Sequence, residues 1–341
     1  MSLIKVKTRG TDNVSGRRNL IINGAMQVAQ RATTVGSLTS SNGYHTCDRY
    51  RFQLSDLGTW ELSQSTESPE EEGFNSSFKL NCTTADSSVA AGSYLIFQQR
   101  IEGQNVQHLK YGTSSAETLT FSFWIKSVKT GLVSLEFQHQ NSGGTYYNRG
   151  ATFTINTTNT WEKKIITVPG NTAQDIKDSN VDGLYATFWF TAGTNYTSGT
   201  HNTSAWVTGS SVVRVSSSGV NFADSTNNEI YITGVQLEVG DTATDFEHRS
   251  FAEEMLQCKR YCDITHATAS NAAGWTADVT NSVNYHFPYR YATRMRIAPT
   301  VTYTAWTHVG FPNSGGGAGG GVTAQRNGVE GTNYYIAANT T

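Results

Sequence analysis

The chain has 341 residues, enough for two domains or for one large β-sandwich with a smaller appendix. Its 25 basic and 27 acidic residues give a formal charge of −2 with no long basic run, which argues against a sequence-independent grip on nucleic acid. No stretch approaches the run of about 20 apolar residues that a spanning helix needs, so we expect no membrane insertion.

The composition favours strands and turns over helices. Thr, Val, Tyr, Phe and Trp suit half-buried strands, and the abundant Asn, Gly and Ser suit the turns between them. Helix formers such as Leu, Glu and Lys are scarce over most of the length. The composition therefore predicts an all-β protein.

Residues 1–18 form a polar segment that carries Arg9, Arg17 and Arg18 but has almost no apolar periodicity. Such a segment has little to bury and orders only against a neighbour. We interpret it as an N-terminal arm that attaches the protein to a partner through these three arginines. The packed domain is expected to begin at Asn19.

Residues 19–250 contain recurring strand signals. Apolar residues alternate with polar ones at a period of two, most clearly in 119–126, 133–138, 184–190 and 230–239. In the last segment the phase flips at Gly234, which is typical of a β-bulge. One buried and one wet face per strand indicates antiparallel sheets packed as a sandwich, and the lack of alternating helices excludes a doubly wound nucleotide-binding fold.

A short amphipathic helix is predicted after the sandwich, as a connector over residues 251–264. Ser250 and Glu253 form a capping box at its start. Phe251, Met255, Cys258 and Cys262 follow at helical spacing along one stripe. A helix of about three turns is marginal alone, so the stripe must pack on its own sandwich or on another subunit.

A smaller C-terminal β lobe is predicted over residues 265–341. One face of a strand there carries Tyr285, Phe287, Tyr289 and Tyr291. We expect these side chains to pack in the core of the lobe rather than to stack on a ligand. The glycine tract at 314–322 lacks the lysine and Ser/Thr spacing of a phosphate loop and is expected to be a loop or hairpin tip.

The sequence offers little for catalysis, metal binding or a cofactor. Four scattered cysteines and eight histidines show no zinc-ligand spacing, so we expect no metal and no cofactor. Glycan cleavage would need two carboxylates about 5–10 Å apart. The acidic run Glu70–Glu72 is expected to be a solvated loop. Asp48 and Glu238 are expected to fix turns or to accept hydrogen bonds at a strand edge. We therefore expect no enzymatic activity.

Glycan binding is the functional hypothesis that the residues support. Sugars are held by aromatic faces and planar polar groups, and the chain has 7 Trp, 16 Tyr and 15 Phe. Trp124 and Trp189 lie on the polar phase of their strands, where they could contact a sugar. The alternative is that a loop, the helix or another subunit covers both rings.

Four segments carry a resemblance to a known family: residues 19–31, 48–52, 234–250 and 253–261. Together they resemble a domain common in phage tail-fibre and related appendage proteins. The resemblance implies a jelly-roll sandwich similar to carbohydrate-binding modules. It also implies a virion component, often trimeric. Because the first residues lack the apolar core of a secretory signal, we expect synthesis in the host cytoplasm.

Two functions fit this resemblance. In the first, the protein is a short tail fibre or fibre-like appendage that recognises a host cell-surface glycan. In the second, it is a capsid-surface or tail decoration with a purely architectural role. In both, we expect a homotrimer with the helix at 251–262 near the axis or a subunit boundary, because closed rings protect sheet edges. The N-terminal arm would contact other virion proteins.

Overall fold

The computed structural model describes residues 18–264, 278–281, 284–301, 322–327 and 331–337, and leaves the side chains of 278–289 and 322–337 undescribed. The chain divides into two compact units, Met1–Glu254 and Met255–Thr341. The division falls a few residues after the boundary that the sequence analysis places at residue 250.

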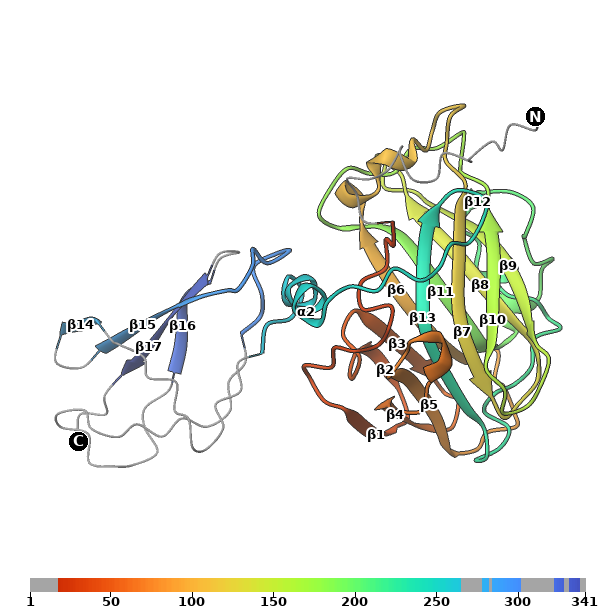
Figure 1. Ribbon diagram of the computed structural model, residues 1–341, viewed down its shortest axis with the longest axis horizontal. Helices are drawn as coiled ribbons and strands as arrows, with labels where there is room; N and C mark the ends of the chain where they lie inside the picture. Colours follow the sequence, from red (N-terminus) through yellow and green to blue (C-terminus); the bar gives the residue numbers. More distant parts are fainter. Residues whose placement is uncertain (1–17, 265–277, 282–283, 302–321, 328–330, 338–341) are drawn as a thin grey trace, which may run out of the picture. The chain divides into compact units, whose positions relative to one another are not determined.

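The first unit is a sandwich of two antiparallel sheets (Figure 1). The six-stranded sheet has the order β1 (Thr34–Leu38), β4 (Thr59–Ser65), β5 (Ser77–Thr84), β13 (Glu229–Val239), β7 (Leu119–Ser127) and β10 (Glu162–Val168). The seven-stranded sheet has the order β12 (Val207–Thr208), β9 (Tyr146–Ile155), β8 (Gly131–Gln140), β11 (Asp182–Ala192), β6 (Tyr94–Glu102), β3 (Tyr50–Ser55) and β2 (Ser41–Tyr44). The chain crosses repeatedly between the sheets, and the predicted all-β jelly-roll sandwich is confirmed.

Short helical elements occupy the connections. Among the described residues, the 3-10 turns are η1 (Glu70–Glu72), η2 (Gly103–Asn105), η3 (Gln107–Leu109) and η4 (Ser211–Val213). An additional α-helix, α1 (Thr194–Thr197), follows β11. The sequence analysis expected a single helix, and α1 escaped it because four residues are too few to show a helical period.

The core lies between the two sheets and is built largely from phenylalanine. On β7, Leu119, Phe121, Phe123 and Ile125 are fully buried, as their alternation predicted. Phe188 of β11 meets Phe123 across the sandwich, with ring centroids 4.8 Å apart and planes at 84°. Edge-to-face contact of this kind adds about 0.5–1.5 kcal/mol to the burial of apolar area. The aromatic rings therefore join the sheets as well as filling the space between them.

The bulge predicted at Gly234 is confirmed. Pairing between β13 and β7 shifts register between Thr233 and Gln236, and Gly234 has a φ of +60°. A Cβ atom there would lie 2.7 Å from Cζ of Phe74 and 2.9 Å from Cδ1 of Trp124. Glycine is thus required both by the backbone conformation and by the two rings packed above it.

A buried polar network, which we call the terminal clasp, joins the beginning of the sandwich to its end. Arg249 has a side chain only 5% exposed, and it pairs with Glu254 at 3.0 Å and with Glu247 at 3.1 Å. Its guanidinium also donates to the carbonyls of Asn19 and Ile21. The Glu254 carboxylate accepts a 2.8 Å hydrogen bond from the Asn23 amide. The segments that carry the family resemblance therefore contact one another directly.

The helix after the sandwich, α2, spans Phe251–Lys259 and ends earlier than the predicted 264. Its start is as expected, because the Glu253 amide donates to Oγ of Ser250 at 3.3 Å. The expected apolar stripe is buried only in part. Cys258 is buried, Met255 and Cys262 are half-buried, and Phe251 is 56% exposed. Glu254 is buried instead, because it belongs to the terminal clasp.

The C-terminal lobe contains a four-stranded antiparallel sheet. Its order is β14 (Asp278–Asn281), β15 (Asn284–Arg290), β17 (Gly331–Ala337) and β16 (Val322–Asn327). The predicted stripe from Tyr285 to Tyr291 falls mostly on β15, where the side chains of residues 284–289 lie outside the described part. The glycine tract also lies almost wholly outside the described residues. Within the described ranges, no helix is long and apolar enough to cross a membrane.

The first prediction concerns the terminal clasp. Replacing Arg249 by methionine leaves the Glu254 carboxylate, 7% exposed, buried without its cation. We expect a loss of about 3 kcal/mol in the free energy of unfolding, because an unpaired buried charge is strongly destabilising. Urea unfolding measures it. Lys110→Gln, which breaks an exposed pair with Glu117, is the control and is expected to change stability by less than about 0.5 kcal/mol. Equal stability of Arg249→Met and the wild type would contradict this account.

His139 makes the sandwich sensitive to acid. The side chain is fully buried on β8, and its ring stacks on Tyr147 with centroids 5.5 Å apart. Its Nε2 atom lies 2.9 Å from Nδ2 of Asn171. Burial lowers the pKa of His139 to about 4, and the nearby Asp175 opposes this only in part. The folded protein therefore holds a neutral imidazole at pH values where the unfolded chain is protonated.

The second prediction follows from this difference. Between about pH 6.5 and pH 4 the unfolded state binds more protons at this site, so stability falls as the pH falls through that window. From pH 7 to pH 5 we expect His139 to lower the free energy of unfolding by about 2 kcal/mol. Each pH unit below the ordinary pKa of histidine contributes about 1.36 kcal/mol to this loss. Urea unfolding at both pH values, for wild type and His139→Gln, isolates this contribution. The same pH dependence in both proteins would show that His139 is not its source.

Candidate functional site

The outward face of the seven-stranded sheet is polar and aromatic, in contrast to its apolar core face. Residues paired directly across antiparallel strands point to the same side of a sheet. One such row joins Gln98, Thr187 and Glu136, and the neighbouring row joins Arg100, Tyr185 and Gln138. These are the polar phases of β6, β11 and β8, so this face gathers amide, guanidinium, carboxylate and phenol groups.

Five side chains form a connected group that we call the Arg100 cluster: Arg100, Asp182, Tyr185, Tyr146 and Gln98. The Tyr146 ring joins it edge-on at Tyr185, with centroids 6.1 Å apart. The Arg100 guanidinium lies 4.9 Å from the centre of the Tyr185 ring. It donates to Oδ2 of Asp182 at 2.6 Å and to Oε1 of Gln98 at 2.8 Å. The Tyr185 hydroxyl donates to Oδ2 of Asp182 at 3.3 Å. Burial raises the pKa of Tyr185 well above its ordinary value, so this hydroxyl remains a donor.

The Arg100 cluster keeps unused hydrogen-bonding capacity at the surface. The side chains of Arg100 and Asp182 are 24% and 33% exposed, and Tyr146 is 38% exposed. Within the described part of the chain, neither Nη2 of Arg100 nor Oδ1 of Asp182 has a hydrogen-bond partner. The cluster therefore offers a fixed donor and a fixed acceptor next to an accessible aromatic ring.

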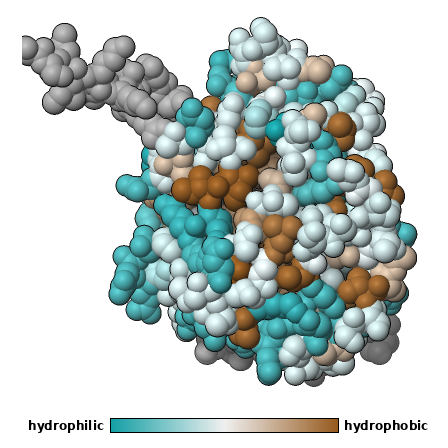
Figure 2. All heavy atoms as spheres, turned by 90° about the vertical axis from the view of Figure 1, so that its right-hand side faces the viewer, coloured by the Kyte–Doolittle hydropathy of each residue, from teal (hydrophilic) through white to brown (hydrophobic). Residues whose placement is uncertain are grey.

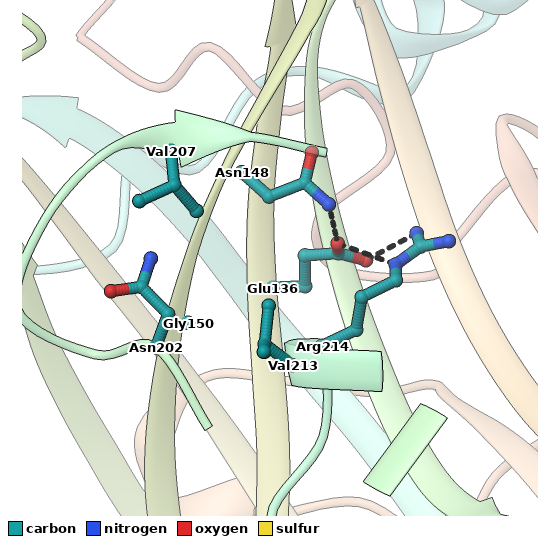
Figure 3. Close-up of a pocket in the computed structure, with 7 residues that line it drawn as sticks. All are labelled: Glu136, Asn148, Gly150, Asn202, Val207, Val213 and Arg214. Atoms are coloured by element: carbon teal, nitrogen blue, oxygen red, sulfur yellow. Dashed lines mark hydrogen bonds and ion pairs between the residues drawn. The ribbon is translucent and has the colours of Figure 1, made fainter. Parts of the chain in front are cut away.

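Glu136, in the middle of the same face, is saturated by its neighbours (Figure 3). Arg214 donates to both carboxylate oxygens, from Nε at 2.7 Å and from Nη2 at 2.6 Å. Asn148 donates to Oε1 at 2.5 Å, and Nε1 of Trp189 donates to Oε2 at 3.0 Å. With 1% exposure and four donors, this carboxylate has no free position for a substrate or a proton relay.

A small pocket lies beside Glu136 and Arg214 (Figure 3). Its empty volume is about 190 Å³, including open solvent, and its wall is Glu136, Asn148, Gly150, Asn202, Val207, Val213 and Arg214. Because that volume counts open solvent, the enclosed space is smaller still. Sites for organic ligands usually measure about 300–1,000 Å³, so this pocket is too small for a sugar chain.

Residues 193–221, which we call the covering segment, include the edge strand β12 and also bring Tyr196 and Arg214 over Trp189 on this face. Its ring is packed against Tyr196, with centroids 5.2 Å apart, and under the Arg214 guanidinium at 4.9 Å. Trp189 is only 2% exposed. The prediction that Trp189 contacts a glycan is therefore corrected. Its ring has a structural role, because another segment of the same chain covers it.

Trp124, the second predicted contact, lies on the outward face of the other sheet and is partly exposed. Both tryptophans point away from the core, as their strand phase indicated. They do not belong to one site, because β7 and β11 are in different sheets.

The remaining predicted site residues fall outside a common site. Arg9 and Arg17 lie outside the described residues. Arg18 is on the sandwich itself, where its backbone amide donates to Glu247 at 3.2 Å and Nη1 donates to Thr244 at 3.1 Å. Phe251, Met255, Cys258 and Cys262 belong to or follow helix α2. The described part of the chain contains no group of three or more His, Cys, Asp or Glu side chains placed to hold a metal ion.

The carboxylates that the sequence analysis assigned to turns do fix turns. Oδ1 of Asp48 accepts from the Gln30 amide at 3.2 Å, and Glu238 accepts from the Thr244 amide at 2.8 Å. Glu70, Glu71 and Glu72 are exposed in η1.

Sequence reasoning did not find the Arg100 cluster. Tyr185 was visible as an aromatic residue on the polar phase of its strand, which is a usable signal. Arg100 and Asp182 gave none, because they are 82 positions apart and meet only through the pairing of β6 with β11.

Comparison with known proteins finds no matching family model and no curated protein. Solved structures do match, with modest scores. One is the enzymatically active domain of tailspike protein 4 of bacteriophage CBA120, with 14% identity and a TM-score of 0.34, covering 65% of this chain but 21% of that one. A sugar-binding protein from Bacteroides thetaiotaomicron, so described provisionally, has 10% identity and a TM-score of 0.36, covering 65% and 100%.

Carbohydrate-binding modules also occur among these structures. The C-terminal family 22 module of a Clostridium thermocellum protein has 12% identity and a TM-score of 0.32, covering 61% of this chain and 98% of the module. All three TM-scores are below 0.5, so the alignments assign neither a ligand nor a role to this chain. The resemblance to phage tail-fibre proteins stays a prediction.

Proposed function

We propose that the protein is a glycan-binding protein and that the Arg100 cluster contacts the sugar. The observation that carries this proposal is the exposed guanidinium, carboxylate and phenol group held together on one sheet face. Sugar hydroxyls donate and accept at once, so they pair with an aspartate that accepts and an arginine that donates. The Tyr146 ring supplies an apolar surface for the C–H side of a sugar ring.

The rigidity of this arrangement supports the proposal. Arg100, Asp182 and Tyr185 already hold one another through a cation–π contact, one ion pair and one hydrogen bond. Side chains fixed before binding lose little conformational entropy when a ligand arrives. Strands of a sheet position such groups more firmly than loops do.

We propose that binding is not followed by catalysis. Glycoside cleavage requires one carboxyl group that can give a proton and a second that can accept one or attack. Glu136 is closed off by Arg214, Asn148 and Trp189. Asp182 is engaged by Arg100 and Tyr185. These contacts leave no pair of carboxyl groups free for the two roles that cleavage requires.

The resemblance of the opening and closing segments supports a place for the protein in a phage virion, as a short tail fibre or fibre-like appendage that recognises a host-surface glycan. In the terminal clasp the opening and closing segments contact each other directly, so they form one structural unit. A capsid-surface or tail decoration with an architectural role is the alternative. Electron micrographs of virions labelled with antibody to this protein would distinguish the two, by label at the tail tip or on the capsid.

The third prediction tests the glycan site. Wild-type protein is expected to bind a subset of bacterial surface oligosaccharides on a glycan array. Arg100→Met, which keeps the apolar stem over Tyr185 but removes the charge and donors, should weaken binding about tenfold or more. Urea midpoints verify that the variant is folded, and Lys110→Gln is the matched surface control. Full binding by Arg100→Met, or no glycan bound by the wild type, would refute the proposal.

The fourth prediction concerns assembly, for which we propose a homotrimer with α2 at the subunit contact. Phe251 and Leu256 are 56% and 50% exposed, which is unusual for large apolar side chains on a nine-residue helix. Mass photometry should give about 112 kDa, from three chains of 37.2 kDa. Phe251→Asp should shift the protein towards monomer without unfolding it, because the side chain is exposed within one chain. A wild-type monomer at micromolar concentration would disprove the trimer.

A further inference from the structure

We propose a second ligand site, on the outward face of the six-stranded sheet, that binds a sugar residue carrying a carboxylate. We call it the tryptophan platform and define it by Trp124, Trp161, Lys126 and Lys163. It lies on a different sheet from the Arg100 cluster and does not depend on that cluster's function. Its elements come from β7, from β10 and from the residue just before β10.

The pairing of β10 with β7 places these residues on one face. Lys163 is paired with Trp124, which is in turn paired with Thr233 of β13. In the next row, Lys126 is paired with Tyr231. The Trp161 ring meets the Tyr231 ring edge-on, with centroids 6.3 Å apart. Both tryptophan side chains are partly exposed on this outward face.

The Trp124 ring packs against the β-bulge of β13 at Gly234. Gly234 leaves room for it, because a Cβ atom at that position would come within 2.9 Å of Cδ1 of Trp124. Phe74 packs over the same glycine. The ring therefore has a fixed position while part of its surface stays accessible. A fixed, flat and partly exposed ring is suited to stacking on the C–H side of a sugar.

The charges of the platform indicate the class of sugar. Lys126 pairs with Glu67 at 2.9 Å, and Lys79 pairs with Glu229 at 2.7 Å. Both ammonium groups also lie over Tyr231, at 5.4 Å and 5.3 Å from its centre. Lys163 is exposed and has no acidic partner among the described residues. These three lysines and two glutamates leave one positive charge, next to Trp124.

An unpaired ammonium beside an indole ring matches a ligand that is flat on one side and anionic at its edge. A uronic acid residue of an acidic polysaccharide has both features. A neutral sugar would leave the Lys163 charge unused. A nucleic acid would need several cations along a groove, whereas only one of the three lysines named here, Lys163, lacks an acidic partner among the described residues.

The test uses polygalacturonate as the probe, with its fully methyl-esterified form as the neutral control that has the same sugar backbone. Isothermal titration calorimetry measures binding to the full chain. We expect the acidic polymer to bind and the esterified form to bind more weakly. Trp124→Ala should weaken binding about tenfold, as loss of aromatic stacking does elsewhere. Lys163→Gln should weaken it about threefold, and added salt should reduce that difference.

Because Trp124→Ala removes a ring that packs on Gly234, Lys163→Gln provides the variant that is expected to fold normally. Lys110→Gln is the control for loss of a surface charge, and Arg100→Met is the control for the other site. Binding that is unchanged in Lys163→Gln and Trp124→Ala would overturn the platform, as would no binding to the wild type. Loss of binding in Arg100→Met alone would assign the acidic sugar to the Arg100 cluster, which overturns the platform but leaves the proposed glycan function intact.

Discussion

Burial of the Arg249 guanidinium couples the two ends of the sandwich. A charged group with 5% exposure is stable only when its partners are in place, and those partners come from residues 19–23 on one side and 247–254 on the other. The Asn19 side chain adds to this link, because Nδ2 donates to the Val235 carbonyl at 3.1 Å. Strand β13, which ends the sandwich, lies between β5 and β7 in the middle of its sheet. The network therefore holds the last strand in register by contacts with the first residues of the domain.

The two outward faces of the sandwich carry different side chains. The seven-stranded face is partly closed by the covering segment, which the bidentate contact between Arg214 and Glu136 fastens down. What stays open there is the Arg100 cluster, a group rich in polar atoms. The six-stranded face exposes tryptophan and lysine instead. On the side of the molecule seen in Figure 2, apolar side chains form separate patches among polar ones, so no continuous apolar area is presented there.

The charged side chains described above fall into two groups, those whose hydrogen-bonding positions are all filled and those that keep one position unfilled. Glu136 and Glu254 have their acceptor positions filled by donors of the same chain, so they specify how segments pack. Asp182 and Arg100 are also held by neighbours, but each keeps one atom, an oxygen and a nitrogen respectively, without a hydrogen-bond partner among the described residues. The physical difference is the number of donors that the fold brings to each group. A saturated carboxylate stabilises structure, whereas a partly satisfied one at the surface is available to a ligand.

The sequence by itself determined the features that depend on neighbours along the chain. Alternation in 119–126 and 184–190 showed which side chains enter the core, Gly234 marked the bulge, and Ser250 marked the start of α2. It also showed that Trp124 and Trp189 point outward. Only the tertiary structure decided that Trp189 is covered while Trp124 is partly open, because the covering segment is brought there by contacts with Glu136 and Trp189. The same holds for α2, where Glu254 is buried in place of Phe251 through a partner 231 residues away. Local periodicity records which way a side chain points, and what it meets there depends on contacts between distant segments.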